Sequence, residues 1–285
     1  MASSKTTPTP APKDFIRQAD GTIELHIKIP QEQIKKTWET VMAQVIDSAK
    51  MPGFRPGKAP RKVVEESTDK SKVREEVLQK LIPQLYIEAV QKNNIRPIVN
   101  PKIHVDSIED EKDWEFTATT CEMPKVELGE YKKAVQAITA KSKIAVPGKE
   151  ETKPNLDELV KAVVDNVKVT IPSLLVEYEA DRLLSQTLDE IKRLGLSLDQ
   201  YLSSTNKTPE DLRKDYEARA INDMTVEFSL SQIADSEQIA IEEKEIEEAI
   251  QKAKDPTERS QMEANKYLLS SILRQQKTLD FLQNL

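Results

Sequence analysis

Apolar and polar residues alternate along residues 22–29, TIELHIKI, which form the first regular segment of the chain. The apolar positions are Ile23, Leu25, Ile27 and Ile29. A period of two is typical of a strand that buries one face. Pro30 ends the pattern, and Asp20-Gly21 before it predicts a hairpin turn from a short strand at residues 15–18.

The apolar period then changes to that of helices, and two more strand-like segments follow before residue 124. Helices are predicted at residues 31–49, 61–66 and 69–93, and strands at residues 98–107 and 114–123. Pro83 lies inside the third helical pattern, where a kink or break is expected because proline cannot donate the helical hydrogen bond. The order strand, helix, helix, strand, strand predicts an α+β domain with a small antiparallel sheet.

Residues 131–154 lack strong periodicity and are interpreted as a linker. Every later segment has a helical pattern, with start signals at Asn155 and Thr208-Pro209 and a stop signal at Gly195. The apolar positions of the last helix are Tyr267, Leu268, Ile272, Leu279 and Leu282. The predicted organisation is a disordered tail at residues 1–12, an α+β domain at 13–130, a linker at 131–154 and an all-helical domain at 155–285.

Composition adds a shape and a compartment to this picture. Charged residues make up 32% of the chain, hydrophobic residues 38% and aromatic residues only 5%. Few large side chains are available to fill a compact interior, so we expect an elongated protein with several thin cores. The net charge of −7 argues against a general nucleic-acid binder. No stretch approaches the ~18 apolar residues of a membrane span, and the first residues contain no apolar run, which favours a cytoplasmic protein without membrane contact.

The sequence offers no candidate for catalysis or for a bound cofactor. Its six glycines form no Gly-rich phosphate loop, which excludes the common nucleotide-binding motifs. His26 and His104 fall on the polar faces of predicted strands, without partners at metal-ligand spacing. Cys121 has no histidine near it in the sequence and is interpreted as a semi-buried structural thiol. We therefore expect no catalytic residue, no metal and no cofactor.

The segment MPGFRPGKAP, residues 51–60, reverses the charge of the protein locally. No acidic residue lies between Asp47 and Glu65. The cations in that stretch are Lys50, Arg55, Lys58, Arg61 and Lys62. Its prolines restrict the backbone, which lowers the entropic cost of docking on a partner. Phe54 in a partner's pocket would contribute roughly 1.5–3 kcal/mol, whereas the alternative interpretation is that Phe54 folds back onto the core of its own domain.

Residues 53–60, GFRPGKAP, resemble the signature loop of trigger factor, the bacterial family of ribosome-associated chaperones. The family pattern Gly-Phe-Arg-x-Gly-Lys-x-Pro is matched at each fixed position. The resemblance runs from about residue 15 to the family-like VELGEYK at 126–132. VTIPSLLVEYEADRLLSQ, at residues 169–186, is similar to the start of that family's helical arm region.

The resemblance implies docking on a large-subunit ribosomal protein beside the exit tunnel, with rRNA phosphates nearby. The implied ribosome-binding residues are Gly53, Phe54, Arg55, Gly57, Lys58 and Pro60. Some members carry a third basic residue where this chain has Pro56, which implies a weaker or differently shaped contact. The helical domain and its arms would form a cradle that shields unfolded nascent chains without ATP, and the free protein would be able to form a homodimer.

One departure from the family is large. Trigger factors usually carry a peptidyl-prolyl isomerase domain between the two regions, and the linker is too short to hold it. The sequence is therefore interpreted as a short form that keeps the chaperone and is not an enzyme. Candidate client contacts are Met224, Phe228, Tyr267 and Leu268, although an apolar stripe at helical spacing is more often core. The alternatives are a periplasmic-type chaperone with prolyl isomerase activity and an RNA-binding module that acts through residues 50–62.

Overall fold

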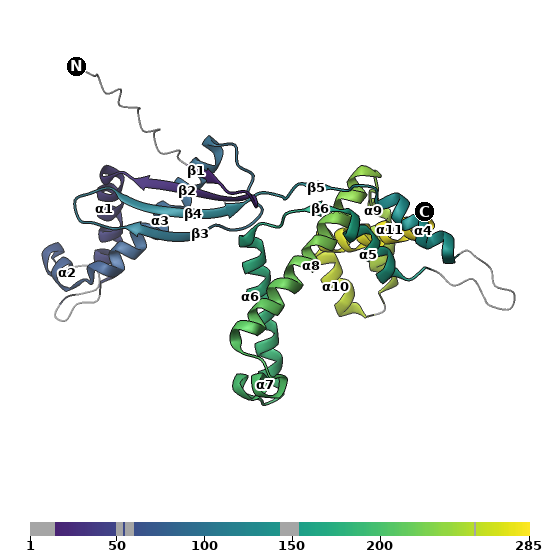
Figure 1. Ribbon diagram of the computed structural model, residues 1–285. Coiled ribbons are helices and arrows are strands. Elements are labelled where there is room, and N and C mark those ends of the chain that lie inside the picture. The colour runs from purple at the N-terminus through teal and green to yellow at the C-terminus, as the bar shows by residue number, and fades with distance from the viewer. Residues whose placement is uncertain (1–14, 50–53, 55–59, 143–153, 254) are drawn as a thin grey trace, which may run out of the picture. The chain divides into compact units, whose positions relative to one another are not determined.

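The chain is described by a computed structural model that covers residues 15–49, 54, 60–142, 154–253 and 255–285 (Figure 1). The described residues divide into two compact units, one within residues 1–123 and one within residues 124–285. Each unit has a buried core of its own. The tail predicted at residues 1–12 and the part of the predicted linker at residues 143–153 lie outside the described residues.

The first unit is built on a four-stranded antiparallel sheet with the strand order β1-β2-β4-β3. Its strands are β1 (Phe15–Arg17), β2 (Thr22–Ile29), β3 (Lys102–Ser107) and β4 (Trp114–Cys121). Strand β2 pairs with β4 over its whole length, from Thr22 opposite Cys121 to Ile29 opposite Trp114. The alternating pattern of β2 and the hairpin from β1 are both confirmed, since the odd-numbered apolar residues of β2 are buried.

Three helices complete the first unit: α1 (Gln31–Ser48), α2 (Arg61–Ser67) and α3 (Lys70–Lys92). Leu25 and Phe116 of the sheet share one buried cluster with Val41 of α1 and Val77 of α3. This arrangement is the predicted α+β fold with a small antiparallel sheet. The break considered at Pro83 does not occur, because α3 continues as one helix through that residue.

The second unit is mostly helical. Its helices are α4 (Tyr131–Ser142), α5 (Leu156–Asn166), α6 (Ser173–Arg193), α7 (Leu198–Thr205), α8 (Pro209–Ser236), α9 (Glu243–Lys252), α10 (Pro256–Ala264) and α11 (Lys266–Asn284). Two short strands, β5 (Val126–Glu127) and β6 (Lys168–Val169), pair with each other in antiparallel fashion, and the sequence had not predicted either. The predicted terminal helix that carries Tyr267 and Leu282 is α11, whereas α10 had not been predicted.

The core of the second unit lies where α4, α5, α8 and α11 meet. Val135, Leu159, Ile233 and Leu282, one from each of these helices, are fully or almost fully buried there. Helices α6 and α8 leave this core as a hairpin, and α7 lies at its far end (Figure 1). The hairpin has its own buried contacts, which include Leu183 of α6 and Leu212 of α8.

The prediction that a linker begins at residue 131 is wrong, because residues 131–142 form helix α4. Tyr131, Val135 and Thr139 follow one another at intervals of four and are all buried. The Tyr131 hydroxyl donates a hydrogen bond of 2.9 Å to Oε1 of Glu237 on α8, and burial with this bond raises the pKa of Tyr131. The buried face of α4 has only these three fully buried residues, and one of them is a threonine. The periodic apolar signal was therefore too weak to predict a helix.

Candidate functional site

The basic loop joins α1 to α2 in the first unit. Helix α1 ends at Ser48, and the exposed Pro60 occupies the cap position immediately before α2. Between them, Phe54 exposes 44% of its surface. This exposure contradicts the alternative in which Phe54 is buried in the core of its own domain. Of the other residues implied in ribosome binding, Gly53, Arg55, Gly57 and Lys58 lie outside the described residues.

Arg61, at the first position of α2, is held by two carboxylates. It pairs with Oε1 of Glu65 one turn ahead at 2.5 Å and with Oε2 of Glu39 on α1 at 2.7 Å. The hydrogen bonds to Glu65 and Glu39 hold the pKa of the Arg61 guanidinium above its usual range. The sequence counted Arg61 among the cations offered to a partner. The structure instead uses it to connect α1 to α2 at the base of the loop.

A hollow of ≈ 750 Å³ lies beside this base, between α1, α2 and α3. Trp38 and Met42 of α1 and Val73 of α3 contribute apolar surface to it, whereas the rest of its lining is mostly charged. Arg74 lies on the same lining and pairs with Asp110 at 3.2 Å. Such a lining suits an apolar side chain flanked by charges on a partner protein.

The four candidate client contacts divide into two pairs. Met224 on α8 retains only 8% of its exposure and Phe228 is half-buried, because this part of α8 packs against neighbouring helices. The choice of Met224 as a surface contact is therefore corrected. Tyr267 and Leu268 at the start of α11 expose 91% and 59% of their surfaces. Ile272, one turn beyond Leu268, is also exposed, and sequence reasoning had assigned it only to the apolar pattern of the helix.

Sequence reasoning also missed three exposed leucines between α6 and α7. Leu194, Leu196 and Leu198 lie around Gly195, which had been interpreted only as a helix stop. Leu194 is exposed although Ile191, three residues before it, is buried. One signal in the sequence could have identified them. Leucines occur on both sides of Gly195, where the helix ends and the helical period no longer predicts which face is buried.

The residues that the sequence singled out for possible chemistry, Cys121, His26 and His104, lie apart in the described structure, on strands β4, β2 and β3. Burial raises the pKa of the Cys121 thiol to about 11, so the thiolate needed for nucleophilic attack is disfavoured. His26 and Thr117 contact each other through Nδ1 and Oγ1 at 3.0 Å on the exposed side of the sheet. Within the described part of the chain, no three His, Cys, Asp or Glu residues converge as a metal site would require. In the same residues, no helix is both long and apolar enough to cross a membrane.

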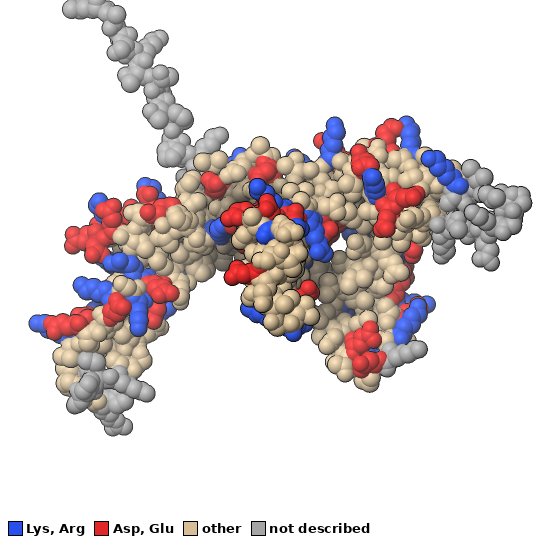
Figure 2. Space-filling view, turned by 60° about the horizontal axis from the view of Figure 1, so that its bottom comes forward, with Lys and Arg blue, Asp and Glu red and all other residues tan. Residues whose placement is uncertain are grey.

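The surface carries charges of both signs. Figure 2 shows acidic and basic side chains intermingled over the visible face of the protein. An exposed aromatic ring on a loop of one unit, with exposed apolar groups at helix ends of the other, is typical of a protein that binds other macromolecules.

Two family comparisons assign the chain more closely. The family described as "Bacterial trigger factor protein (TF)" matches residues 15–159, and "Bacterial trigger factor protein (TF) C-terminus" matches residues 132–284. The chain belongs to the bacterial trigger factor family. Because the two matched regions overlap, the chain has no room between them for the peptidyl-prolyl isomerase domain region, and the predicted short form is confirmed in this respect.

Individual relatives resemble the N-terminal part of the chain. The trigger factor of Pelotomaculum thermopropionicum is 38% identical over 112 residues, which are 39% of this chain and 26% of that protein. The trigger factor of Halothermothrix orenii is 39% identical over 116 residues, 40% of this chain and 27% of that protein. The matches thus span about a quarter of the length of these curated relatives.

A solved structure is similar over nearly the whole chain. It is titled "Promiscuous Substrate Recognition in Folding and Assembly Activities of the Trigger Factor Chaperone" and covers 95% of this chain and 99% of its own. The TM-score is 0.65 and the sequence identity is 12%. At this identity the likeness concerns the fold, which agrees with a small sheet followed by a mostly helical unit.

Proposed function

We propose that this protein is an ATP-independent chaperone that docks beside the ribosomal exit tunnel through residues 53–60 and shields unfolded nascent chains. The exposure of Phe54 carries the proposal. An aromatic side chain that follows Pro52 and precedes Pro56 in the sequence and is 44% exposed is available to a partner's pocket. Burial of the exposed 44% of the side chain in that pocket would contribute roughly 0.7–1.3 kcal/mol of the ~8 kcal/mol of a micromolar complex.

The base of the loop supports the same proposal. Because Arg61 is engaged by Glu39 and Glu65, the cations left for rRNA phosphates or an acidic protein surface are Lys50, Arg55, Lys58 and Lys62. Four cations in an otherwise acidic chain give a local attraction that falls with salt. This charge is too small and too local for a general RNA-binding module, which would need a broader basic surface.

Client contact is proposed for the exposed end of α11. Tyr267, Leu268 and Ile272 each expose more than half of their surface. Such a group can take up an apolar side chain of an unfolded polypeptide and release it quickly, since little area is buried. No nucleotide is needed for contacts of this kind. On this proposal the protein acts as a holdase in the cytoplasm, without isomerase activity.

The docking half is tested with the Phe54→Ala/Arg55→Ala variant in ribosome co-sedimentation. We expect ribosome affinity to fall about tenfold, because the exposed part of the ring accounts for about 1 kcal/mol and the loss of the Arg55 contacts adds to it. The matched control is Ile16→Ala/Lys35→Ala, which removes one exposed apolar residue and one exposed cation of α1 from the same unit, outside the basic segment. Equal binding of both variants would refute the docking role of the loop.

Two further measurements separate the alternatives. Binding of purified protein to naked RNA, with an affinity that falls steeply as salt rises, would favour the RNA-binding module. Acceleration of cis–trans exchange in a proline peptide would favour the periplasmic-type prolyl isomerase. For the proposed chaperone we expect neither result, and instead suppression of aggregation of a denatured protein without ATP.

A further inference from the structure

Arg61, the first residue of α2, is bonded to carboxylates on two different helices. Its Nε donates to Oε1 of Glu65 on α2 at 2.5 Å, and its Nη2 donates to Oε2 of Glu39 on α1 at 2.7 Å. The planar guanidinium can hold both carboxylates at once, because its donors have a fixed geometry that a lysine ammonium lacks. We call these three residues the arginine bridge.

Helix α1 gives the arginine bridge a fixed support. Val41 and Met42, which follow Glu39 in α1, are buried in the core of the first unit. Lys80 of α3 donates from Nζ to Oε1 of Gln44 at 2.6 Å and connects α1 to α3 as well. The position of Glu39 is therefore set by the core and by a second helix.

Helix α2 has much less to fix its position. Of its seven residues, all of which are described, Val64 alone is buried. The hollow of ≈ 750 Å³ between α1, α2 and α3 is lined by Arg61 and Glu65, so apolar packing does not join α2 to its neighbours on this side. A helix of this length is not stable by itself in water. With one buried residue, α2 can turn about that residue unless the contact between Arg61 and Glu39 supplies a second fixed point.

The position of α2 determines where the basic loop ends. Pro60 directly precedes Arg61, and its carbonyl accepts hydrogen bonds from the amides of Val63 and Val64 at 3.0 and 3.3 Å. Pro60 therefore moves together with α2. Because proline restricts the backbone at this junction, a change in the orientation of α2 is passed on to the segment before it, which contains Phe54.

The charge of the arginine bridge has the opposite effect on docking. One guanidinium against two carboxylates leaves a net charge of −1, which opposes the attraction of the loop cations to a phosphate or an acidic surface. Loss of the Glu39 charge would strengthen that attraction, whereas loss of its contact with Arg61 would release α2. The electrostatic and the positional consequences of one substitution thus differ in sign.

We propose that Arg61 is a positioning residue for docking, which holds α2 against α1 through Glu39 and so sets the direction in which the basic loop presents Phe54 to its partner. The inference rests on the proposed function, because it requires that the loop docks on the ribosome. It extends that function by assigning Arg61 to the support of the loop and not to contact with phosphates.

The test measures the affinity of the full chain for purified ribosomes by co-sedimentation at one fixed salt concentration. We expect Glu39→Gln to weaken binding about two- to fivefold, although it removes a negative charge, since an exposed ion pair has a modest effect. Arg61→Lys keeps the charge without the bridging geometry and should weaken binding to a similar extent. Glu65→Gln is the matched control, because it removes the same charge but leaves α1 connected to α2, and it should not weaken binding.

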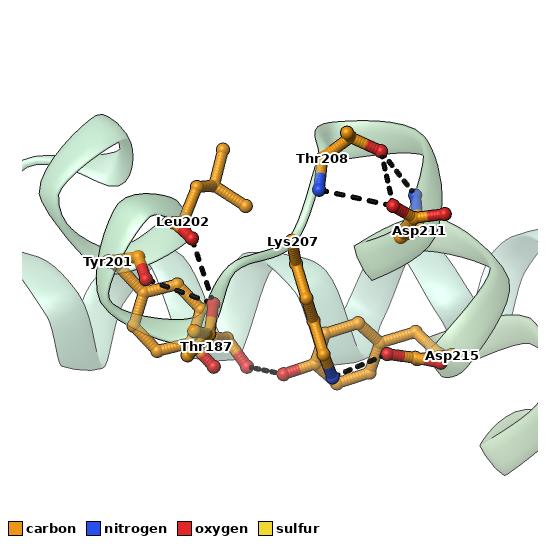
Figure 3. A network of polar contacts seen from close by, with 9 residues as sticks. Thr187, Tyr201, Leu202, Lys207, Thr208, Asp211 and Asp215 are labelled. Carbon is orange, nitrogen blue, oxygen red and sulfur yellow. Dashed lines mark hydrogen bonds and ion pairs between the residues drawn. The ribbon is translucent and has the colours of Figure 1, made fainter.

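An ion pair of the second unit controls for the general effect of losing such a contact. Lys207 Nζ contacts Asp215 Oδ2 at 2.6 Å, next to the capping box of Thr208 and Asp211 that begins α8 (Figure 3). This pair is similar to that of Arg61 and Glu39 in length and in exposure. Lys207→Ala should therefore leave ribosome affinity unchanged if the effect belongs to the support of the loop.

A double-mutant cycle tests whether Arg61 acts through the loop. In the Phe54→Ala/Arg55→Ala background, Glu39→Gln should weaken binding no further, because the groups that it positions are gone. A purely structural role of Glu39 would give the same loss in both backgrounds. The urea midpoint of the first unit, followed by tryptophan fluorescence, should be the same for Glu39→Gln and the unaltered protein.

The outcomes separate the two proposals. Stronger binding of Glu39→Gln would overturn the positioning role in favour of charge alone, and an equal loss in Glu65→Gln would show that the connection to α1 has no part in docking. Unchanged binding of Glu39→Gln and Arg61→Lys, with Phe54→Ala/Arg55→Ala still defective, would overturn this inference and leave the proposed function intact. Full binding of the Phe54→Ala/Arg55→Ala variant would overturn both.

Discussion

Removal of two methyl groups from the centre of α4 should destabilise the second unit strongly. Val135 is fully buried against α5, α8 and α11, so Val135→Ala leaves a cavity in the core. Two buried carbons at about 0.8 kcal/mol each, plus the cost of an incompletely closed cavity, give a loss of about 2–3 kcal/mol. For a unit of this size we expect the thermal midpoint to fall by about 5–10 °C.

The two units provide an internal control for this measurement. Both tryptophans of the chain, Trp38 and Trp114, lie in the first unit. Urea unfolding followed by tryptophan fluorescence therefore reports the first unit, whereas far-UV circular dichroism reports mainly the helices of the second. Val135→Ala should shift the dichroism transition and leave the fluorescence transition in place. Gln136→Ala, at the exposed neighbouring position, is the matched control and should change neither by more than about 0.5 kcal/mol.

The result that would refute this reasoning is an unchanged dichroism transition for Val135→Ala. It would mean that residues 131–142 are not part of the cooperative unit, as the linker interpretation holds. A shift of the fluorescence transition of equal size would contradict the assignment of Val135 to the second core.

Further predictions concern two glycines of the second unit and the cysteine of the first. Gly129 has φ of +53°, and a Cβ there would lie 2.3 Å from the carbonyl oxygen of Asn166; Gly129→Ala should therefore cost more than about 3 kcal/mol in urea unfolding. Gly195→Ala, at φ of +73° with open space around it, should cost only about 1–2 kcal/mol, and equal costs would contradict the steric argument. Cys121 should resist alkylation at pH 8 until the first unit unfolds, and rapid labelling of the native protein would show that its thiol is accessible. Because burial raises its pKa from 9.0 to about 11, its contribution to stability is complete below pH 9 and is lost as the pH rises through 11, which urea titrations at pH 8 and pH 11 would measure.

The first unit was predictable because its signals are local and strong. Strand β2 alternates without exception, so its bounds and its buried face follow from the pattern alone. Helix α3 was predicted almost to the residue, since Asp69 supplies a cap whose side chain accepts from the amide of Ser71. Pro83 misled the prediction only in part, because tertiary packing of Val77 and Leu81 before it maintains the helix.

The second unit was harder because its signals depend on distant partners. Helix α4 buries a single row of side chains. The residues that cover this row come from α5, α8 and α11, which are distant in the sequence. Strands β5 and β6 are two residues long and exist only because they meet each other across some forty residues of chain. Neither element has a pattern of its own that a local window could detect.

The site followed the same division. The motif at residues 53–60 could be recognised from the sequence. Whether Phe54 is exposed depends on whether it packs into a core, and the sequence of the motif does not determine that. The same applies to Met224 and Tyr267, which share an apolar character and lie at opposite extremes of exposure. The exposure of a residue depends on the residues that pack around it. Apolar periodicity therefore identifies candidate binding residues, and only the packing shows which of them are exposed.

Helix α11 carries both buried and exposed residues in one apolar sequence pattern. Its apolar positions continue along the helix, yet Leu282 near the end is fully buried in the core while Leu268 near the start is more than half exposed. A stripe longer than the surface it packs against must leave its remainder in solvent, and that remainder favours aggregation unless charge surrounds it. The 32% of charged residues provides this surround, so the protein can expose small apolar groups, each too small to bind a folded partner stably, without associating with itself through them. On the proposed function the low aromatic content fits the same requirement, because small aliphatic contacts would bind weakly and release quickly, whereas a single large ring such as Phe54 would hold one defined partner.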